Sequence, residues 1–286
     1  MDDLSDLIVA IDLMCIMFGM GLSLTTGDFQ RILKQPKAVF IGLSNQLIIL
    51  PLIGFVLVSL IPMRPEVAIG VMVLVACPGG ATSNLISHLA KGDTALSVTL
   101  PAVASLVTIV SIPLIIQFSL FRFLDSEQEV LLNVPQTIGQ LLMIVVLPVA
   151  LGMLLRAKAT RFALKMDRPV RIASGLLLAL ITLGLIIKER ENILPYLEQA
   201  GLPAVLLCVL TMSLGFLAAK VFRLGIRQAI SISIESGIQN SALAITIATV
   251  TLQNTGFGIA AAIYTLIMYA AGFAAILYGR RVVAKA

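Results

Sequence analysis

Long apolar runs without a charged side chain are the feature that most constrains what this chain can form. One run lies between Lys37 and Arg64, and another extends from Ser236 to Gly279. Of the 286 residues, 59% are hydrophobic and 12% are charged, which lies outside the range of soluble globular proteins. A helix of about 20 apolar residues spans the hydrocarbon of a bilayer. The sequence therefore predicts an all-α polytopic membrane protein that is embedded in a lipid bilayer.

About nine transmembrane helices are expected, and we expect them to form a single transmembrane domain over residues 1–286. No connecting segment is long enough to fold on its own, and the longest basic connection, 156–171, is short. The expected spans are 4–26, 36–61, 66–90, 94–121, 130–156, 170–188, 199–221, 227–250 and 255–280.

Basic residues alternate between the expected connections. All but four of the 20 lysine and arginine residues fall in one set of connections, which includes the C-terminal end. The other set contains Arg64, Arg122, Lys188 and Arg190, together with acids that include Asp125, Glu127 and Glu129. Because cytoplasmic connections retain Lys and Arg, we expect the N-terminus outside, the C-terminus in the cytoplasm, and a location in the cell inner (plasma) membrane. Topology then accounts for the net charge of +5, and no nucleic-acid partner is expected.

Two of the expected spans contain polar or helix-breaking residues near their middle. The eighth contains Glu235, Gly237, Gln239 and Asn240. A carboxylate at the bilayer centre costs about 2.5 kcal/mol or more, so it indicates a functional site whose partner is a cation, a proton or a substrate. The third contains Pro78, which is followed by two glycines. Proline removes a backbone donor and glycine disfavours the helix, so both spans are predicted to be broken.

The two broken helices occupy comparable positions in the two halves of the chain. Repeat one, about 1–122, has four helices with the break in its third, and repeat two, about 130–286, has five helices with the break in its fourth. The third helix would run inward and the eighth outward, so we expect an inverted repeat. In transporters, such paired breaks surround a midplane site where unwound carbonyls bind Na⁺ and half-helix N-termini attract an anion.

Each polar candidate also has a purely structural interpretation. Glu235 could be a protonated carboxyl that bonds to a neighbouring helix, and Gln239 could form only an interhelical hydrogen bond. Asn84 and Asn240 could cap the broken half-helices, either instead of contacting a ligand or in addition to it. Gln46, another polar residue within an apolar run, could serve helix packing alone.

Four segments together resemble the bile acid:sodium symporter family and its bacterial homologues. They occur in the family's order and at compatible spacing, and the resemblance covers nearly the whole chain. The segments are 17–22 (Met-Phe-Gly-Met-Gly-Leu), 77–84 (Cys-Pro-Gly-Gly-Ala-Thr-Ser-Asn), 90–97 (beginning Ala-Lys-Gly-Asp and ending Ala-Leu-Ser) and 235–241 (Glu-Ser-Gly-Ile-Gln-Asn-Ser). Nine spans resemble the animal members, whereas many bacterial relatives are similar to a ten-helix arrangement that starts one helix earlier.

The resemblance implies a core domain with two crossing broken helices and a panel domain made of the other spans. The core would comprise about 36–122 and 199–282, and the panel about 4–26 and 130–188. Two bound Na⁺ ions are also implied, with oxygen ligands as a hard cation requires. Sodium site one would use Ser83, Asn84, Ser97 and Glu235, and sodium site two would use Gln46, Glu235 and Gln239 with the backbone carbonyls of Ser236 and Ile238.

The implied substrate is an organic anion, either bile acid-like or a small carboxylate. Asn240 and the backbone N–H groups at the crossover would meet the anion, with Thr82 and Ala81 as neighbours. Similar proteins place a threonine ligand one turn after the serine that corresponds to Ser97, but this chain has Pro101 there, which offers no side-chain oxygen. Sodium site one is therefore expected to be the weaker of the two.

These expectations combine in a sodium-coupled secondary active symporter that imports an organic anion by alternating access. The alternative is a proton-coupled organic anion carrier in which Glu235 is the proton site. A membrane-embedded enzyme is a remote alternative, because Glu235 has no second carboxylate at a suitable depth and the single His88 lies at the expected membrane interface. We therefore expect a transporter and not an enzyme.

Overall fold

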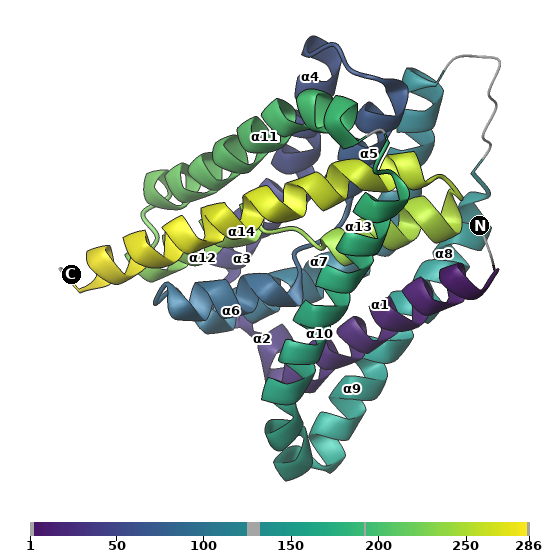
Figure 1. Ribbon diagram of the computed structural model, residues 1–286. Helices are drawn as coiled ribbons and strands as arrows, with labels where there is room; N and C mark the ends of the chain where they lie inside the picture. Colours follow the sequence, from purple (N-terminus) through teal and green to yellow (C-terminus); the bar gives the residue numbers. More distant parts are fainter. Residues whose placement is uncertain (1–2, 125–131, 192, 285–286) are drawn as a thin grey trace.

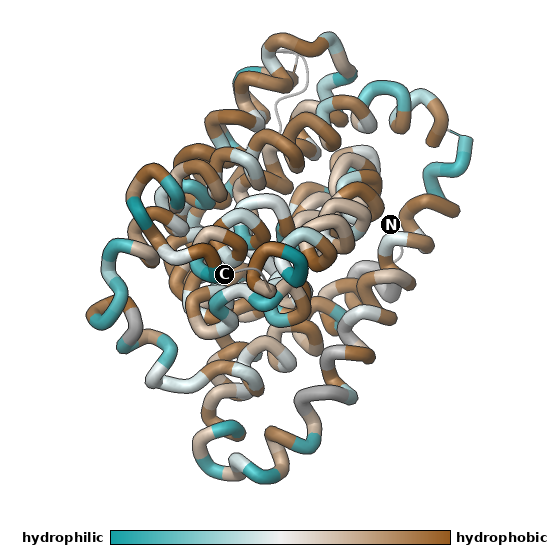
Figure 2. Tube along the Cα trace, turned by 90° about the vertical axis from the view of Figure 1, so that its left-hand side faces the viewer, coloured by the Kyte–Doolittle hydropathy of each residue, from teal (hydrophilic) through white to brown (hydrophobic). Residues whose placement is uncertain are grey.

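The computed structural model describes residues 3–124, 132–191 and 193–284, and the elements within these ranges are helical apart from an isolated bridge (Figure 1). Five helices in the described residues are long and apolar enough to cross a membrane. They are Pro36–Leu60, α7 (Thr94–Phe123), Val134–Lys158, α11 (Ile193–Val221) and α14 (Thr255–Val283). Hydrophobic residues follow the lengths of the helices, and hydrophilic residues lie at many of the turns (Figure 2). The prediction of an all-α polytopic membrane protein is confirmed.

Two of these spans contain a π-helical turn just before a proline. Pro36–Leu60 consists of α3 (Pro36–Ser44), η1 (Asn45–Ile49) and α4 (Leu50–Leu60), and Val134–Lys158 consists of α8 (Val134–Leu141), η2 (Leu142–Val146) and α9 (Leu147–Lys158). Pro51 and Pro148 follow the two wide turns. A proline ring clashes with the carbonyl four residues earlier, and a wider turn moves that carbonyl away. In the first span the wide turn contains Asn45 and Gln46, which are both buried.

The first expected span, 4–26, is shorter than the sequence predicts. α1 (Asp3–Ser23) ends at Ser23, and the chain bends by 71° into α2 (Thr26–Lys34), which was expected to be a connection. The N–H and hydroxyl of Thr25 donate to Asp28 Oδ2 at 2.8 and 2.7 Å. This local turn stabilises the start of α2, and the apolar pattern of α1 gives no sign of it.

The third and eighth expected spans are interrupted where proline and glycine predict. The first consists of α5 (Pro65–Ala76) and α6 (Ala81–Leu89), and the second consists of α12 (Ile226–Gly237), α13 (Ser241–Thr246) and the π-helical turn η3 (Ile247–Thr251). The prediction of two broken helices is therefore confirmed. α7, by contrast, continues through both Pro101 and Pro113.

Two helices extend beyond the expected spans. α10 (Thr160–Lys188) begins only two residues after the end of α9, so most of the expected connection 156–171 is helical. α11 begins at Ile193, although the apolar pattern predicts a start at 199. Charged residues are compatible with helix outside the hydrocarbon, so hydropathy marks only the part of a helix that lies within the membrane. The acids Asp125, Glu127 and Glu129 lie outside the described residues.

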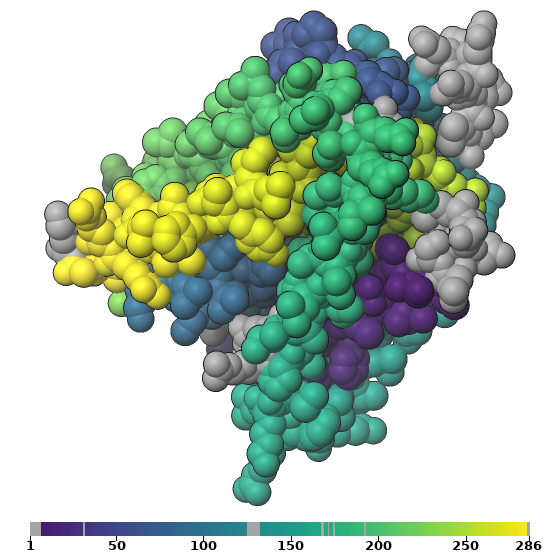
Figure 3. Space-filling model, viewed as in Figure 1, coloured from purple at the N-terminus to yellow at the C-terminus, as the bar shows by residue number. Residues whose placement is uncertain are grey.

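The helices pack in two groups. α1 packs against α9 and α10, while α14 packs against α5, α11 and α13. The two groups meet at α10, which crosses one face of the molecule and packs against both α1 and α14 (Figure 3). Both broken helices belong to the group around α14, because α12 packs against α11, α6 and α7.

Close contact between α1 and α9 depends on two glycines. A Cβ added to Gly21 would meet the backbone carbonyl of Val149 and would lie 3.0 Å from the Cα of Gly152. Backbone atoms cannot swing aside as a flexible side chain can. Small residues at membrane helix contacts allow such approach and strengthen the van der Waals packing between helices.

We predict that Gly21→Ala lowers the free energy of unfolding by about 1–3 kcal/mol, because the added methyl forces α1 away from α9. The matched control is Gly139→Ala in α8, where a Cβ would meet nothing within 4 Å. That control should be neutral or slightly stabilising, since alanine favours helix over glycine by up to about 1 kcal/mol. Thermal unfolding of the purified proteins in detergent measures both. Equal melting temperatures for the two variants would contradict the proposed contact.

Candidate cation site at the paired helix breaks

The two helix breaks contact each other. The N–H of Asn240 donates to the carbonyl of Pro78 at 3.0 Å, and Gly79 forms an isolated antiparallel bridge with Gln239. Backbone groups at a helix end lack intrahelical partners, and in a membrane they need partners within the protein. Each break therefore supplies a hydrogen-bond partner to the other, and segments far apart in the sequence are joined at this point.

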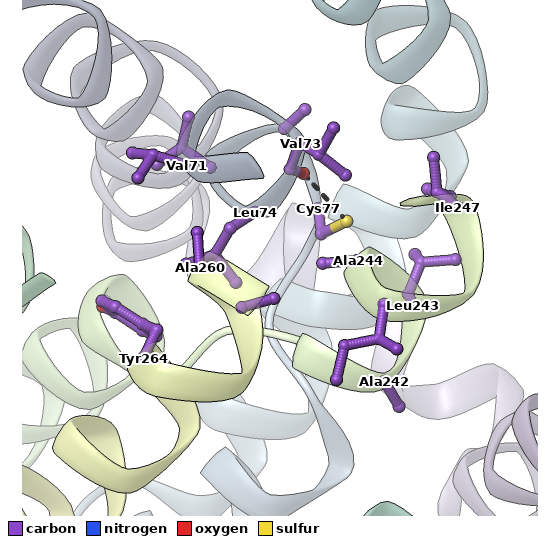
Figure 4. Close-up of a cluster of buried hydrophobic side chains, with 14 of the residues drawn as sticks. Val71, Val73, Leu74, Cys77, Ala242, Leu243, Ala244, Ile247, Ala260 and Tyr264 are labelled. Atoms are coloured by element: carbon purple, nitrogen blue, oxygen red, sulfur yellow. Dashed lines mark hydrogen bonds between the residues drawn. The ribbon is translucent and has the colours of Figure 1, made fainter. Parts of the chain in front are cut away.

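Apolar side chains enclose the crossover. Cys77, which follows α5, and Ala244 of α13 belong to one cluster of buried side chains, and the thiol of Cys77 donates to the carbonyl of Val73 at 3.2 Å (Figure 4). Cys77, Leu243 and Ala244 are each about 1% exposed. The polar groups of the breaks are therefore held in surroundings that exclude water, where a hydrogen bond is stronger and an unpaired polar atom is costly.

The carboxyl group of Glu235 lies beside this crossover and is 1% exposed. The hydroxyl of Ser83 donates to Glu235 Oε2 at 2.8 Å, and the hydroxyl of Ser97 donates to Glu235 Oε1. Ser97 Oγ also lies 3.2 Å from Asn84 Oδ1. Side chains from α6, α7 and α12 thus meet in one oxygen-rich cluster, and they are the four that the resemblance assigns to sodium site one.

Gln46 and Gln239 supply two buried amide groups near the same crossover. Both side chains are buried, and Gln239 Nε2 donates to the carbonyl of Ser236 at 2.8 Å. Gln239 Oε1 and both polar atoms of Gln46 have no hydrogen-bond partner among the described residues. Such unpaired atoms are rare in native interiors and require an explanation. Amide oxygens suit a hard cation such as Na⁺. The Gln46 atom nearest to the space beside Gly79 and the carboxyl group is Nε2, so its amide binds a cation there only with the oxygen turned to that side.

Gly79 leaves room between these groups. A Cβ added to Gly79 would lie 2.8 Å from Glu235 Oε2 and 3.0 Å from Gln46 Nε2. Any residue with a side chain would therefore occupy the space between the carboxyl group and the amide. The residues present, together with the space that glycine leaves, fit a bound Na⁺ ion. The side chains that would hold this ion are those of Glu235, Gln46 and Gln239, and all three are buried. Ile238, the residue before Gln239, is also fully buried.

The two asparagines at the breaks have different structural roles. Asn240 is the N-cap of α13, and its Oδ1 accepts a hydrogen bond from the N–H of Leu243 at 3.1 Å. Its Nδ2 has no partner in the described part of the chain. The expected capping role is thus confirmed for Asn240. Asn84 does not cap α6, because Gly80 is the N-cap of that helix, and Asn84 lies next to Ser97.

A cavity of about 300 Å³ opens beside the first break, between α6 and α7 on one side and α1 and α10 on the other. Ala81 and Thr82 line it, as does His88 at the end of α6. Ser23 and Thr94 add hydroxyl groups to its wall. Asn240 is not among the described residues that line this cavity, so the expected substrate residues are not all brought together in this conformation.

Pro101 lies close to the first break, and the Cβ position built on Gly79 is 3.5 Å from Pro101 Cβ. Pro101 offers no side-chain oxygen at this position next to the carboxyl cluster. The helix around it is uninterrupted, and the hydroxyl of Ser105 donates to the Pro101 carbonyl at 2.6 Å.

The sequence did not single out a pair of serines that lies one helical turn from the carboxyl cluster. Ser87 Oγ and Ser231 Oγ are 2.7 Å apart, and Ser231 also donates to the Asp93 carbonyl at 3.0 Å. Each serine is four residues from a cluster member, Ser83 in α6 and Glu235 in α12, so helical spacing was the available signal. The pair joins the two half-helices on the same side of the crossover.

A helical membrane bundle with two broken helices that meet at a buried oxygen cluster defines a transporter-like class of protein. The family model of the sodium bile acid symporter family matches residues 10–195. The sodium-dependent transporter YocS of Bacillus subtilis is 32% identical over 246 residues, which cover 84% of this chain and 73% of that protein. The chain therefore belongs to the sodium bile acid symporter family and is a sodium-coupled solute cotransporter, not an enzyme.

Other relatives differ in the solutes that their names state. The human ileal sodium/bile acid cotransporter is 30% identical over 242 residues, which cover 84% of this chain and 68% of the human protein. The probable sodium/metabolite cotransporter of Arabidopsis thaliana chloroplasts is 28% identical over 242 residues, 84% of this chain and 58% of the plant protein. The chain thus spans less than two thirds of the plant relative's length.

We predict that Gly79→Ala abolishes the stabilisation of the protein by Na⁺, because the methyl group fills the space between Glu235 and Gln46. The matched control is the next residue, Gly80→Ala, whose added Cβ would meet nothing closer than 3.5 Å. Melting temperatures are measured in NaCl and in KCl at equal ionic strength. If Gly79→Ala kept the wild-type response to Na⁺, the space beside Gly79 would not be a cation site.

Proposed function

We propose that the protein imports an organic anion together with two Na⁺ ions. The observation that carries the proposal is the position of Glu235, a buried carboxyl group held by Ser83 and Ser97 where the two helix breaks meet. A buried charge needs a paired charge and hydrogen bonds, and the groups around Glu235 are neutral oxygens. A sodium ion supplies the positive charge that such a carboxylate requires.

Each sodium ion has its own ligand set, and Glu235 belongs to both sets. Sodium site one uses Ser83, Asn84, Ser97 and Glu235, and sodium site two uses Gln46, Glu235 and Gln239 with the carbonyls of Ser236 and Ile238. The unpaired amide oxygens of Gln46 and Gln239 support site two. Site one is the weaker of the two, because Pro101 supplies no oxygen beside it.

The two halves of the chain form an inverted repeat around the crossover. α5 and α12 have 12 residues each, and the long helices that follow the two broken spans, α7 and α14, have 30 and 29 residues. The antiparallel bridge between Gly79 and Gln239 joins the corresponding points of the two repeats. These similar lengths and the antiparallel contact support the assignment of 1–122 and 130–286 as repeats.

Nine membrane crossings complete the proposal. Besides the five long helices, they comprise α1, the two broken helices and the apolar part of α10, Gly175–Lys188. The helices around α14 form the core, and α1, α8, α9 and α10 form the panel. The basic connections place the C-terminus in the cytoplasm and the N-terminus outside, across the plasma membrane.

The anion binds at the crossover, next to the sodium-binding groups. Asn240 and the N-terminal N–H groups of α6 and α13 attract a carboxylate, and Thr82 and Ala81 form the adjoining wall of the cavity. Na⁺ binding orders the breaks and so prepares this surface for the anion, which couples the two gradients. The core then moves against the panel, and the site opens to the other side of the membrane.

A proton-coupled carrier is the second candidate, because a protonated Glu235 would also satisfy the hydrogen bonds of its surroundings. The two candidates differ in the gradient that drives uptake. Proteoliposomes are tested with an inward Na⁺ gradient at equal pH, and with an inward proton gradient in the absence of Na⁺. Radiolabelled taurocholate, pyruvate and lactate serve as test anions. Uptake that follows the proton gradient and ignores Na⁺ would replace the sodium mechanism with the proton mechanism.

We predict that Glu235→Gln lowers Na⁺-driven uptake at least about tenfold, because it removes the charge shared by both sites. Gln239→Ala should raise the Na⁺ concentration for half-maximal uptake by about tenfold, since it removes one ligand of site two. The control is Glu66→Gln, which removes a carboxylate at the start of α5. In the wild type, Glu66 Oε2 lies 3.5 Å from Arg64 Nε, and this ion pair is separate from the crossover. Full Na⁺-driven uptake by both site variants would contradict the proposed coupling.

A further inference from the structure

Tyr264 of α14 is fully buried, and its hydroxyl donates to the carbonyl of Gly237 at 2.8 Å. In a continuous helix this carbonyl would accept from the N–H of Ser241, four residues later. Ser241 N instead donates to the carbonyl of Gln239 at 3.0 Å. The hydroxyl of Tyr264 therefore replaces the hydrogen bond that the break removes.

The peptide group between Gly237 and Ile238 is held at both of its ends. Its N–H, from Ile238, donates to the carbonyl of Ile234 at 2.8 Å, and its carbonyl, from Gly237, accepts from Tyr264. A planar peptide group fixed at both ends has no freedom to rotate about the chain. The orientation of the neighbouring carbonyls, those of Ser236 and Ile238, depends on this plane.

Two side chains of α11, Met212 and Cys208, also contact Gly237. A Cβ added to Gly237 would lie 2.8 Å from Met212 Sδ, and the thiol of Cys208 lies 3.9 Å from the Gly237 carbonyl. Cys208 is thus a second and weaker donor to the carbonyl that Tyr264 binds. Gly237 lies between two neighbouring helices, and only a residue without a side chain leaves room for Met212.

We propose that Tyr264 is a positioning residue for sodium binding: its hydroxyl fixes the 237–238 peptide so that the Ser236 and Ile238 carbonyls face the ion in sodium site two. The proposal rests on the proposed function, because it concerns the carbonyl ligands of that site. Tyr264 does not contact the ion itself. It acts through the backbone, so the affinity for Na⁺ falls when its hydroxyl is removed.

The test is Tyr264→Phe, which removes the hydroxyl and keeps the ring. The melting temperature is recorded against NaCl concentration, with KCl added to constant ionic strength. We expect the Na⁺ concentration for half-maximal stabilisation to rise about tenfold, which corresponds to about 1.4 kcal/mol. The matched control is Tyr278→Phe, also in α14, where the ring contact with Phe216 survives and the Na⁺ response should not change.

A merely structural tyrosine would lower the melting temperature without Na⁺ and leave the half-maximal Na⁺ concentration unchanged, and that result would overturn the proposal. Cys208→Ala provides a second variant if Tyr264→Phe cannot be purified folded, with an expected rise of two- to threefold, since the thiol is the weaker donor. No rise in Cys208→Ala would then overturn it. A wild-type protein that does not respond to Na⁺ would instead refute the proposed function.

Discussion

The contact between the two helix breaks is the constraint on which the rest of the structure depends. A break exposes backbone groups, and a membrane interior offers no water to satisfy them. Here the Asn240 N–H binds the Pro78 carbonyl, and the backbones of Gly79 and Gln239 pair. Neither break is therefore stable alone, and the two halves of the chain must fold together at this point.

The same contact explains why a carboxyl group can be buried here. Glu235 belongs to the last turn of α12, and the crossover brings the hydroxyls of α6 and α7 to its oxygens. Gly79 keeps the space beside it open, and Gln46 faces that space from a π-helical turn. Backbone irregularity and side-chain chemistry thus support each other, because Gln46 lies in a π-helical turn and Glu235 lies at the end of a broken helix.

Much of the fold and part of the site could be predicted from the sequence, and the division has a physical cause. Apolar runs mark the membrane spans, and Pro78 with its two glycines marks the first break. Hydropathy does not mark where α10 begins, because its first turns lie outside the apolar run. Whether Asn84 caps α6 could not be decided from its residue type, since a cap depends on backbone geometry, and Gly80 occupies the cap position. Tyr264 gave no signal, because its partner is a backbone carbonyl of another helix.

The length of α10 has a further consequence. Its 29 residues extend about 43 Å, whereas the hydrocarbon of a bilayer is about 30 Å thick. Only Ala159 separates it from α9, so the two helices form a hairpin, and the basic residues Arg156, Lys158 and Arg161 at its tip favour water over hydrocarbon. In the proposed transport cycle this tip moves with α1, because α1 packs against both helices of the hairpin. An antibody fragment or a spectroscopic label bound at this tip can therefore report motion of α1, α9 and α10. The probe would not approach the buried centre.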